Sequence, residues 1–341
     1  MRLLLLAGII LTASCFKQKE QEMFSPPRGE RLSLASPLGL PPVPFPADNP
    51  PTRATVELGE QLFLSPVLSV DGTRSCATCH QPDNAFAEAI AVSTGVAKRK
   101  GRRNAPTLLN AAFFAPQFHD GRAMGLEAQA RGPMLNQLEM AHTQESLAAA
   151  LRKSPWPERF RKAFGEGEPN LTKATQALAA YERTLLSGNS PFDRFYFGKD
   201  PKALSERAQR GWEVFRNPQR GNCLVCHTVA NDFALFSDQQ FHNLGAGMNA
   251  QGELTDLGRY EVTKREADKG AFRTPTLRNV ALTAPYMHDG SLKTLKEVID
   301  FYIAGGNAND QLDANLKPLT LSAEERADLL AFLESLTGEM P

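Results

Sequence analysis

Apolar residues recur every three or four positions in several stretches of this sequence, which is the spacing of the buried face of an amphipathic helix. The last stretch is the best marked, because Ser322 and Glu325 form a capping box before a leucine-rich run that Gly338 closes. Similar helical patterns begin near Thr55, Thr143, Thr172 and Ser205. No long segment alternates with the period of a strand. The pattern therefore predicts a mainly helical fold.

The N-terminal residues lack this helical pattern. Residues 1–15 contain Arg2 and then an apolar run that is too short to span a bilayer, which is typical of a secretory signal peptide. Small residues before Cys15 resemble a lipoprotein processing site, so Cys15 is predicted to become a lipid anchor, with ordinary cleavage beside an incidental cysteine as the alternative. Either route predicts export to the periplasm. Residues 16–53 are proline-rich and are predicted to form a linker, either a tether or an extended arm.

Composition and charge exclude some partners. The chain has 341 residues, of which 42% are hydrophobic and 22% are charged, as in an ordinary soluble protein of about two domains. The formal net charge is zero, so nothing predicts a nucleic-acid or anionic-membrane partner.

The cysteines give the first chemical signal. Four of the five lie in two C-x-x-C-H motifs, which are Cys76-Ala77-Thr78-Cys79-His80 and Cys223-Leu224-Val225-Cys226-His227. This pattern is the attachment signature of a c-type haem, with the cysteines bound to the porphyrin and the histidine bound to iron. A thioredoxin-like motif does not need a histidine after both pairs, and a zinc ribbon places its pairs only about 15–20 residues apart. The sequence therefore predicts two covalently bound haems, ligated by His80 and His227.

An internal repeat accompanies the motifs. Residues 106–121 align without a gap on residues 275–290, and both copies contain Pro-Thr-Leu, Ala-Pro and His-Asp-Gly. Each copy follows its own C-x-x-C-H motif. We therefore expect two cytochrome c-like haem domains related by duplication, at residues 54–190 and 200–341.

The residues alone do not decide what faces each iron. His119 and His288 occupy the same repeat position. Both residues could act at the haem edges or between the haems. Alternatively, each could have a structural role in its His-Asp-Gly turn. For His142 and His242 we favour a surface position or local hydrogen bonds. Methionine could also ligate iron, although such residues more often fill a core; the candidates are Met124, Met134, Met140, Met248 and Met287.

Taken together, the two motifs, the repeated blocks, Gln129 and the run Leu138-Glu139-Met140 resemble the bacterial dihaem cytochrome c peroxidase and MauG family over about residues 55–340. The resemblance implies that peroxide reacts at the N-terminal haem, whose proximal ligand is His80. It also implies that Glu139 transfers protons as a general acid–base and that Gln129 holds the bound oxygen species by a hydrogen bond. The alternative for Glu139 is a solvated helix carboxylate.

The resemblance also implies a Ca²⁺ ion between the haems, with ligands from Asn104, Thr283 and Pro285. The sequence departs from the typical peroxidase at three positions. The histidine that caps the resting peroxide haem is replaced by Val96, so this haem is expected to be open without reductive activation. The distal methionine of the second haem is replaced by Tyr302, as in MauG, with a buried core tyrosine as the alternative.

The third departure replaces the tryptophan between the haems with His119, for which the sequence assigns no role. The predicted function is reduction of hydrogen peroxide, with electrons relayed through the second haem from a cytochrome c or cupredoxin. A MauG-like enzyme that uses peroxide and high-valent haems to oxidise a partner protein is one alternative. A dihaem electron carrier without catalysis and a peroxide sensor are the others. The family often forms homodimers, although no interface pattern is visible in the sequence.

Overall fold

The computed structural model describes residues 26–341, so the predicted signal peptide, Cys15 and the start of the proline-rich segment lie outside the described residues. The fold is mainly helical, as predicted, with short 3-10 turns between the helices. The helices are α2 (Arg53–Leu64), α3 (Cys76–Cys79), α4 (Leu126–Leu135), α5 (Gln144–Leu151), α6 (Trp156–Phe164), α7 (Leu171–Glu182), α8 (Pro191–Tyr196), α9 (Glu206–Arg216), α10 (Tyr260–Thr263), α11 (Leu295–Ile303) and α12 (Ala323–Glu334).

Within residues 26–341, the strands form two antiparallel ribbons. The pairs are β1 (Pro116–Gln117) with β2 (Ala123–Met124), and β3 (Phe241–Asn243) with β4 (Ala271–Arg273). Over residues 26–341, none of the helices has the length and apolar character needed to cross a membrane.

The sequence located most helix starts correctly. Thr143, Ser205 and Ser322 are the N-caps of α5, α9 and α12, and each side chain accepts a hydrogen bond from the first helical turn. The helix expected near Thr172 begins slightly earlier, at Leu171. Asn170 caps α7 instead, because its side chain accepts a hydrogen bond from the Lys173 amide at 2.9 Å.

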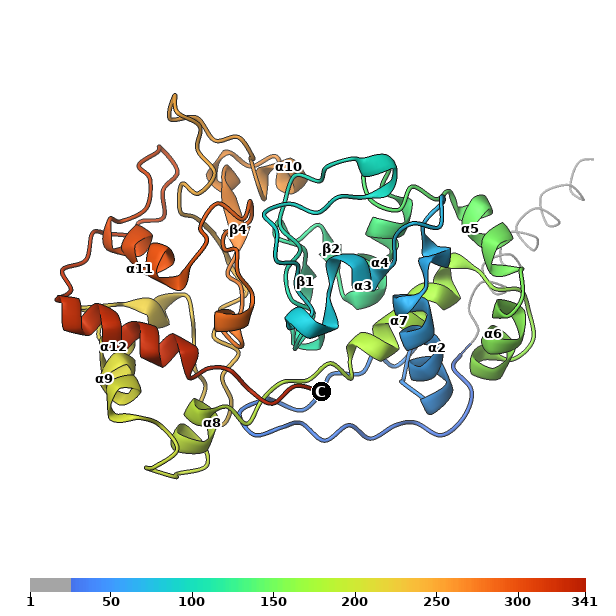
Figure 1. The fold of residues 1–341 in the computed structure, drawn as a ribbon, viewed down its shortest axis with the longest axis horizontal. Helices are drawn as coiled ribbons and strands as arrows, with labels where there is room; N and C mark the ends of the chain where they lie inside the picture. The colour runs from blue at the N-terminus through green and yellow to red at the C-terminus, as the bar shows by residue number, and fades with distance from the viewer. Residues whose placement is uncertain (1–25) are drawn as a thin grey trace, which may run out of the picture.

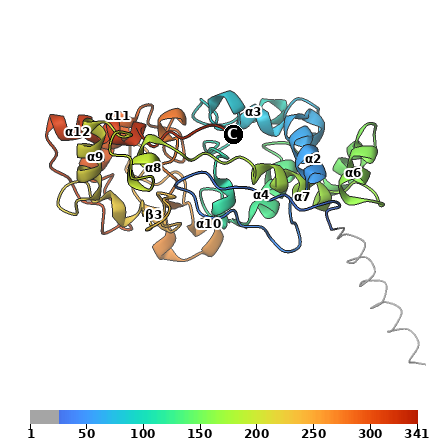
Figure 2. The same ribbon diagram turned by 90° about the horizontal axis from the view of Figure 1, so that it is seen from below.

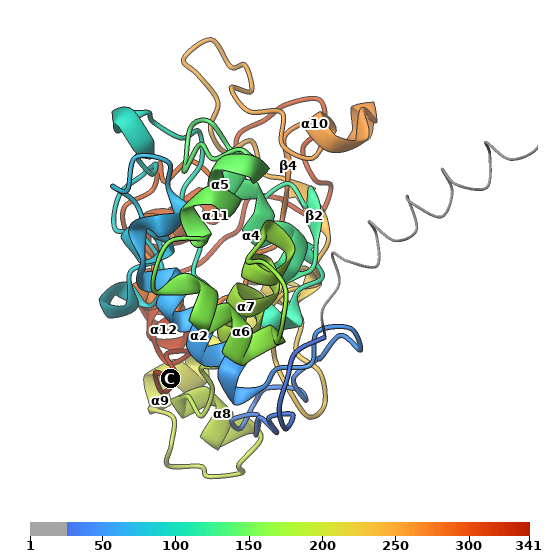
Figure 3. The same cartoon turned by 90° about the vertical axis from the view of Figure 1, so that its right-hand side faces the viewer.

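Two lobes lie side by side, each around its own hydrophobic core (Figure 1). The N-terminal lobe contains a core that runs from Leu58 to Leu185, and the C-terminal lobe contains one that runs from Phe192 to Leu336. The end view shows α2, α6 and α7 gathered in the N-terminal lobe (Figure 3).

The helix before each C-x-x-C-H motif crosses the last helix of its lobe at a glycine. In the N-terminal lobe α2 packs on α7, and a Cβ atom built on Gly59 would lie 2.0 Å from the carbonyl oxygen of Ala177. In the C-terminal lobe α9 packs on α12, and a Cβ atom on Gly211 would lie 1.9 Å from the carbonyl oxygen of Asp328. This shared crossing supports the duplication inferred from the repeat.

Replacing Gly59 with alanine should lower the free energy of unfolding by about 1–3 kcal/mol, because the new methyl group forces α2 away from α7. This cost exceeds the roughly 1 kcal/mol that alanine gains from its helix propensity. The measurement is urea unfolding followed by circular dichroism. Gly101→Ala is the control, because its Cβ atom would meet nothing closer than 3.4 Å. Equal stability of the two variants would contradict the close crossing.

The described part of the proline-rich segment forms an extended arm, residues 26–52, along both lobes (Figures 1 and 2). Leu40 and Val43 of the arm are buried against Phe113 and Leu235, one from each lobe. The carbonyl oxygen of Gly39 accepts a hydrogen bond from the buried Arg278 of the C-terminal lobe. The arm therefore fastens the two lobes to each other.

Candidate active site

A cavity of about 740 Å³ extends through both lobes, and both C-x-x-C-H motifs line it. Most of its wall is apolar. The polar side chains that line it include most of the residues singled out from the sequence: Asn104, His119, Gln129, Glu139, His288 and Tyr302. The chain thus brings together residues that are far apart in the sequence.

The first motif forms the short helix α3, and His80 lies directly after it. The amide of Ser75 donates to the hydroxyl of Thr78 at 3.0 Å, and the amide of His80 donates to the carbonyl oxygen of Cys76 at 2.8 Å. The Nδ1 atom of His80 lies 3.0 Å from the carbonyl oxygen of Pro106. Because a carbonyl can only accept, Nδ1 carries the proton and Nε2 keeps a free lone pair that can bind iron.

The second motif repeats this arrangement. The amide of His227 donates to the carbonyl oxygen of Cys223 at 2.9 Å, and its Nδ1 donates to the carbonyl oxygen of Phe236 at 2.8 Å. Burial lowers the pKa of both imidazoles, His80 and His227. Both rings are therefore neutral and present Nε2, which is the form that ligates a metal.

Glu139 and Gln129 line the cavity together with the first motif. Gln129 lies on α4, and Glu139 follows the end of that helix. The Oε1 atom of Glu139 accepts a hydrogen bond from Asn136 Nδ2 at 2.6 Å. Burial raises the pKa of Glu139, and the hydrogen bond from Asn136 and the charge of Arg122 only partly offset this effect. A carboxyl group with a raised pKa in a cavity is suited to proton transfer.

Val96 is buried, with 3% of its surface exposed, and its amide donates to the carbonyl oxygen of Glu139 at 2.8 Å. Its neighbour Gly95 packs directly on the backbone of Leu138 and Glu139. The loop that carries Val96 is therefore held against the segment that carries Glu139. The side chain of Val96 offers no atom that could bind iron, and the open first haem stays a prediction.

Tyr302 lies on α11 and lines the cavity with Cys223 and Cys226. Burial raises the pKa of its hydroxyl group. Among residues 26–341, this hydroxyl forms no hydrogen bond with another residue. Its hydroxyl is therefore available to a group bound in the cavity, and its role as an iron ligand stays a prediction.

The candidate methionines differ in position. Met124 is 67% exposed, and Met134 and Met140 belong to the core of the N-terminal lobe while touching the cavity. Met287 lines the cavity, whereas Met248 is not part of its lining. Met124 is thus a poor candidate for an iron ligand.

Comparison with known proteins identifies the family of this chain. The model of the family "Di-haem cytochrome c peroxidase" matches residues 53–201. The methylamine utilization protein MauG of Methylorubrum extorquens is 39% identical over 299 residues, which cover 87% of this chain and 82% of that protein. Cytochrome c551 peroxidase of Pseudomonas aeruginosa is 38% identical over 291 residues, which cover 84% of this chain and 79% of that protein. This chain belongs to the dihaem cytochrome c peroxidase and MauG family.

A solved structure agrees with this membership. The crystal structure of a MauG-like protein associated with microbial copper homeostasis superposes with a TM-score of 0.80 at 31% identity, over 91% of this chain and 96% of that chain. Members of the dihaem family carry two haem groups, and this chain has a free imidazole Nε2 for each. The mostly apolar cavity also contains buried cationic nitrogen atoms without partners, which suits an apolar group that carries carboxylates.

In this dihaem family member the two lobes meet through a reciprocal pair of hydrogen bonds. The amide of Asn104 donates to the carbonyl oxygen of His288 at 2.7 Å, and the amide of Arg273 donates to the carbonyl oxygen of His119 at 2.8 Å. The Nε2 atom of His119 also lies 3.0 Å from the carbonyl oxygen of Asn104. The ring of His288 stacks on Phe272 at 3.7 Å between centroids. Both histidines line the cavity and also have structural contacts, so both interpretations from the sequence stay open.

Asn104, Thr283 and Pro285 all line the cavity. The side-chain amide of Asn104 donates from Nδ2 to Ile90, which leaves its Oδ1 atom as an acceptor. Within the described part of the chain, this oxygen and the carbonyl oxygens of Thr283 and Pro285 accept no hydrogen bond. Neutral oxygen atoms with free lone pairs suit Ca²⁺.

His142 and His242 form local hydrogen bonds, as we favoured from the sequence. His142 is buried, with its Nδ1 atom 2.8 Å from the hydroxyl of Ser146. His242 lies between two carboxylates, with Nε2 at 2.9 Å from Asp238 and Nδ1 at 2.5 Å from Asp313.

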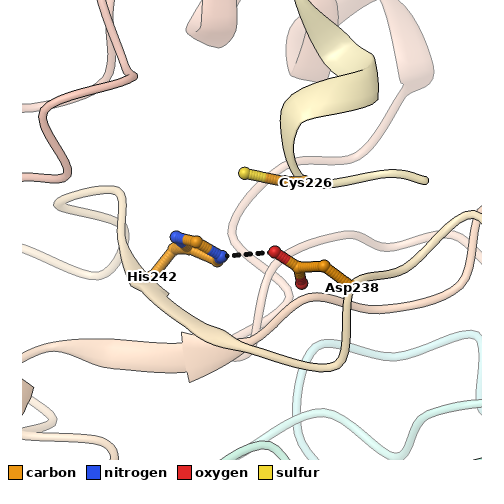
Figure 4. A group of neighbouring side chains, drawn as sticks. All are labelled: Cys226, Asp238 and His242. Atoms are coloured by element: carbon orange, nitrogen blue, oxygen red, sulfur yellow. Dashed lines mark hydrogen bonds and ion pairs between the residues drawn. The ribbon is translucent and has the colours of Figure 1, made fainter.

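The sequence did not reveal that His242 lies beside the second motif. The side chains of Cys226, Asp238 and His242 face one another, with their ligand atoms within 4.8 Å (Figure 4). Cys226, and then Asp313 and Asp238, raise the pKa of His242 to about 10. If Cys226 binds a haem as a thioether, its contribution is lost and the two carboxylates alone hold the proton. This cluster therefore lies directly beside the second C-x-x-C-H motif.

Sequence reasoning also missed the charged residues at the junction of the lobes. Arg103 donates from Nε to Asp256 at 2.7 Å and from Nη1 to Asp120, so it connects the two lobes. Asp120 belongs to the first His-Asp-Gly block, which was the one available signal. Asp256 lies in no repeated motif. It is also far from Arg103 in the sequence, so no local pattern predicts that the two residues pair.

Proposed function

We propose that this protein is a dihaem c-type peroxidase that reduces hydrogen peroxide to water with two electrons and two protons. The observation that carries the proposal is that one cavity is lined both by the two haem-binding motifs and by a carboxyl group with a raised pKa, Glu139. Bound haem supplies the iron that cleaves the peroxide O–O bond and accepts the electrons. A small redox protein, a cytochrome c or a cupredoxin, is the electron donor.

In this proposal the chain's own residues bind the haems and move protons. Cys76, Cys79, Cys223 and Cys226 form the thioether bonds, and His80 and His227 ligate iron. Glu139 accepts a proton from one peroxide oxygen and returns it to the leaving oxygen, which departs as water. Gln129 donates a hydrogen bond that orients peroxide. Asn104, Thr283 and Pro285 bind Ca²⁺ at the junction of the lobes.

Peroxide turnover and the ferric spectra test this proposal together. The purified holoprotein should consume hydrogen peroxide with a reduced cytochrome c or cupredoxin as donor. Its ferric EPR spectrum should contain one high-spin and one low-spin haem, because Val96 leaves the first iron open. Two low-spin signals would refute the open site, and spectra as expected without turnover would favour a peroxide sensor.

A MauG-like oxidation of a partner protein is the second candidate function. It is favoured by Tyr302, whose hydroxyl lines the cavity beside the second motif where a typical peroxidase has methionine. An anionic phenolate stabilises oxidised iron and lowers its reduction potential. Covalent modification of a partner protein in the presence of peroxide, without rapid turnover of a reduced cytochrome, would identify this activity.

Replacing Tyr302 with phenylalanine should change the low-spin EPR signal and leave the high-spin signal unaltered, because only the second haem loses a ligand. The potential of that haem should rise, since an anionic ligand is removed. Tyr286→Phe is the matched control, because its hydroxyl is engaged at 2.9 Å with the carbonyl oxygen of Val280. An unchanged low-spin signal in Tyr302→Phe would show that Tyr302 is not a ligand.

A further inference from the structure

Arg273 occupies a distinctive position at the junction of the two lobes. It ends strand β4, its amide donates to the carbonyl oxygen of His119, and its side chain lines the cavity. The centre of its guanidinium group lies 4.7 Å from the centroid of the Phe114 ring. That cation–π contact holds the guanidinium group near the ring without neutralising its charge.

The guanidinium group of Arg273 lacks an anionic partner. Its Nε and Nη1 atoms are fully buried and form no hydrogen bond with any residue in the described range. Burial alone lowers the pKa of Arg273 to about 10, and no carboxylate offsets this effect. An unpaired buried charge costs several kcal/mol, so a folded protein normally provides a counterion.

The other arginines of the cavity wall do have acidic neighbours. Arg103 and Arg122 both bond to Asp120, and Arg102 donates to Glu261 at 3.0 Å. Arg74 also has a buried Nε atom without a partner, but it lies close enough to Glu88 for its charge to offset part of the rise that burial causes in the pKa of that carboxyl group. Arg273 is therefore the cation of this wall that most needs an anion from outside the chain.

The cavity suggests what the anion is. Each haem carries two propionate carboxylates, and a guanidinium group pairs with a carboxylate through parallel charge-assisted hydrogen bonds. Asn104 is the counterpart of Arg273 when the alignment of residues 106–121 with 275–290 is extended by two positions. The repeat thus places a neutral amide in one lobe and a cation in the other, so the propionate contact is expected on one side only.

We propose that Arg273 binds a propionate carboxylate of a haem in this cavity and so fixes that haem to the junction of the lobes. The proposal rests on the presence of haem, which the family implies, and not on peroxide chemistry. Because the backbone of Arg273 is bonded to His119, the same residue connects the haem to the first His-Asp-Gly block. Arg273 acts here as a positioning residue that also sets the charge beside the haem.

Holoprotein carrying Arg273→Met tests the proposal through reduction potentials and resonance Raman spectra. Loss of the cation should lower the potential of one haem, since the oxidised haem carries the extra positive charge, and should shift one propionate bending band. The haem affected, high-spin or low-spin, identifies which haem supplies the carboxylate. Arg273→Lys should give a smaller shift. Arg102→Met is the control, because its side chain is 55% exposed and paired with Glu261.

Unchanged potentials and propionate bands in Arg273→Met, with both haems attached, would overturn the proposal. If that variant does not retain haem, the test uses Arg273→Lys instead. Wild-type bands and potentials in the lysine variant would exclude a bidentate contact between Arg273 and a propionate. Haem content, measured as the pyridine haemochrome, tests separately whether the protein binds two haems at all. Wild-type protein without two haems would refute that assignment instead.

Discussion

Replacing Glu139 with glutamine should slow peroxide reduction by about 10²–10⁴-fold, the usual contribution of a general acid–base group. Glutamine retains the size of the side chain and can still accept the hydrogen bond from Asn136, but it cannot take a proton from peroxide. Both haems should stay attached, because Glu139 contacts neither motif through a hydrogen bond within residues 26–341. The measurement is steady-state turnover together with haem content.

Glu88→Gln is the matched control for this variant. Glu88 is also a buried carboxyl group with a raised pKa in the same lobe, but it does not line the cavity. Its replacement should leave the turnover rate near that of the wild type. A wild-type rate in Glu139→Gln would remove Glu139 from the mechanism, and equal losses in both variants would indicate a general structural effect.

The pH profile gives an independent view of the same group. Burial raises the pKa of Glu139, so its proton-accepting carboxylate form is lost at a higher pH than for an ordinary glutamate. The rate should therefore fall as the pH decreases through this raised pKa. The acidic limb of the profile should vanish in Glu139→Gln, where only a low residual rate remains.

Local sequence signals predicted much of this molecule. Capping residues such as Ser205 and Ser322 act within one helical turn, so their effect can be read directly from the chain. The C-x-x-C-H motifs are also local, because the two sulfur atoms and the imidazole lie within five residues. The structure brings Gln129 and Glu139 to one cavity with the first motif, but their roles stay predictions that the resemblance supplied.

Contacts between distant segments escaped the sequence analysis. Arg103 and Asp256 are paired across the junction of the lobes, and nothing near either residue predicts the other. The proline-rich arm likewise has no helical or strand period, yet Leu40 is buried because it finds apolar surface where the lobes meet. Such contacts depend on how the lobes are placed relative to each other, which local patterns do not encode.

The buried ion pair of Arg278 and Asp193 is the second site where we expect a large effect. Two nitrogen atoms of Arg278 donate to the carboxylate of Asp193 at 2.9 Å, and both side chains are at most 1% exposed. Arg278 also donates to the carbonyl oxygens of Gly39 in the arm and Ala234 in the C-terminal lobe. One guanidinium group therefore connects α8, the arm and the C-terminal core.

Replacing Arg278 with methionine should lower the free energy of unfolding by about 3–5 kcal/mol, because the charge of Asp193 is then buried without its partner. Arg326→Met is the control, since its pair with Asp300 is exposed and should contribute less than about 1 kcal/mol. Denaturant unfolding of the holoprotein measures both. The arm should also become more sensitive to proteolysis, because the contact with Gly39 is lost.

The double variant Arg278→Met/Asp193→Asn separates the ion pair from the packing around it. Asparagine keeps an oxygen atom that can accept from the Ser190 amide and hydroxyl, which cap α8, and removes the negative charge. Each single variant leaves one buried charge without its partner, whereas the double variant removes both charges. The loss of unfolding free energy in the double variant should therefore be smaller than the sum of the losses in the two single variants. Additive losses would mean that the two charges do not depend on each other. In that case the arm and α8 would be held chiefly by the carbonyl contacts and by apolar packing around Leu40.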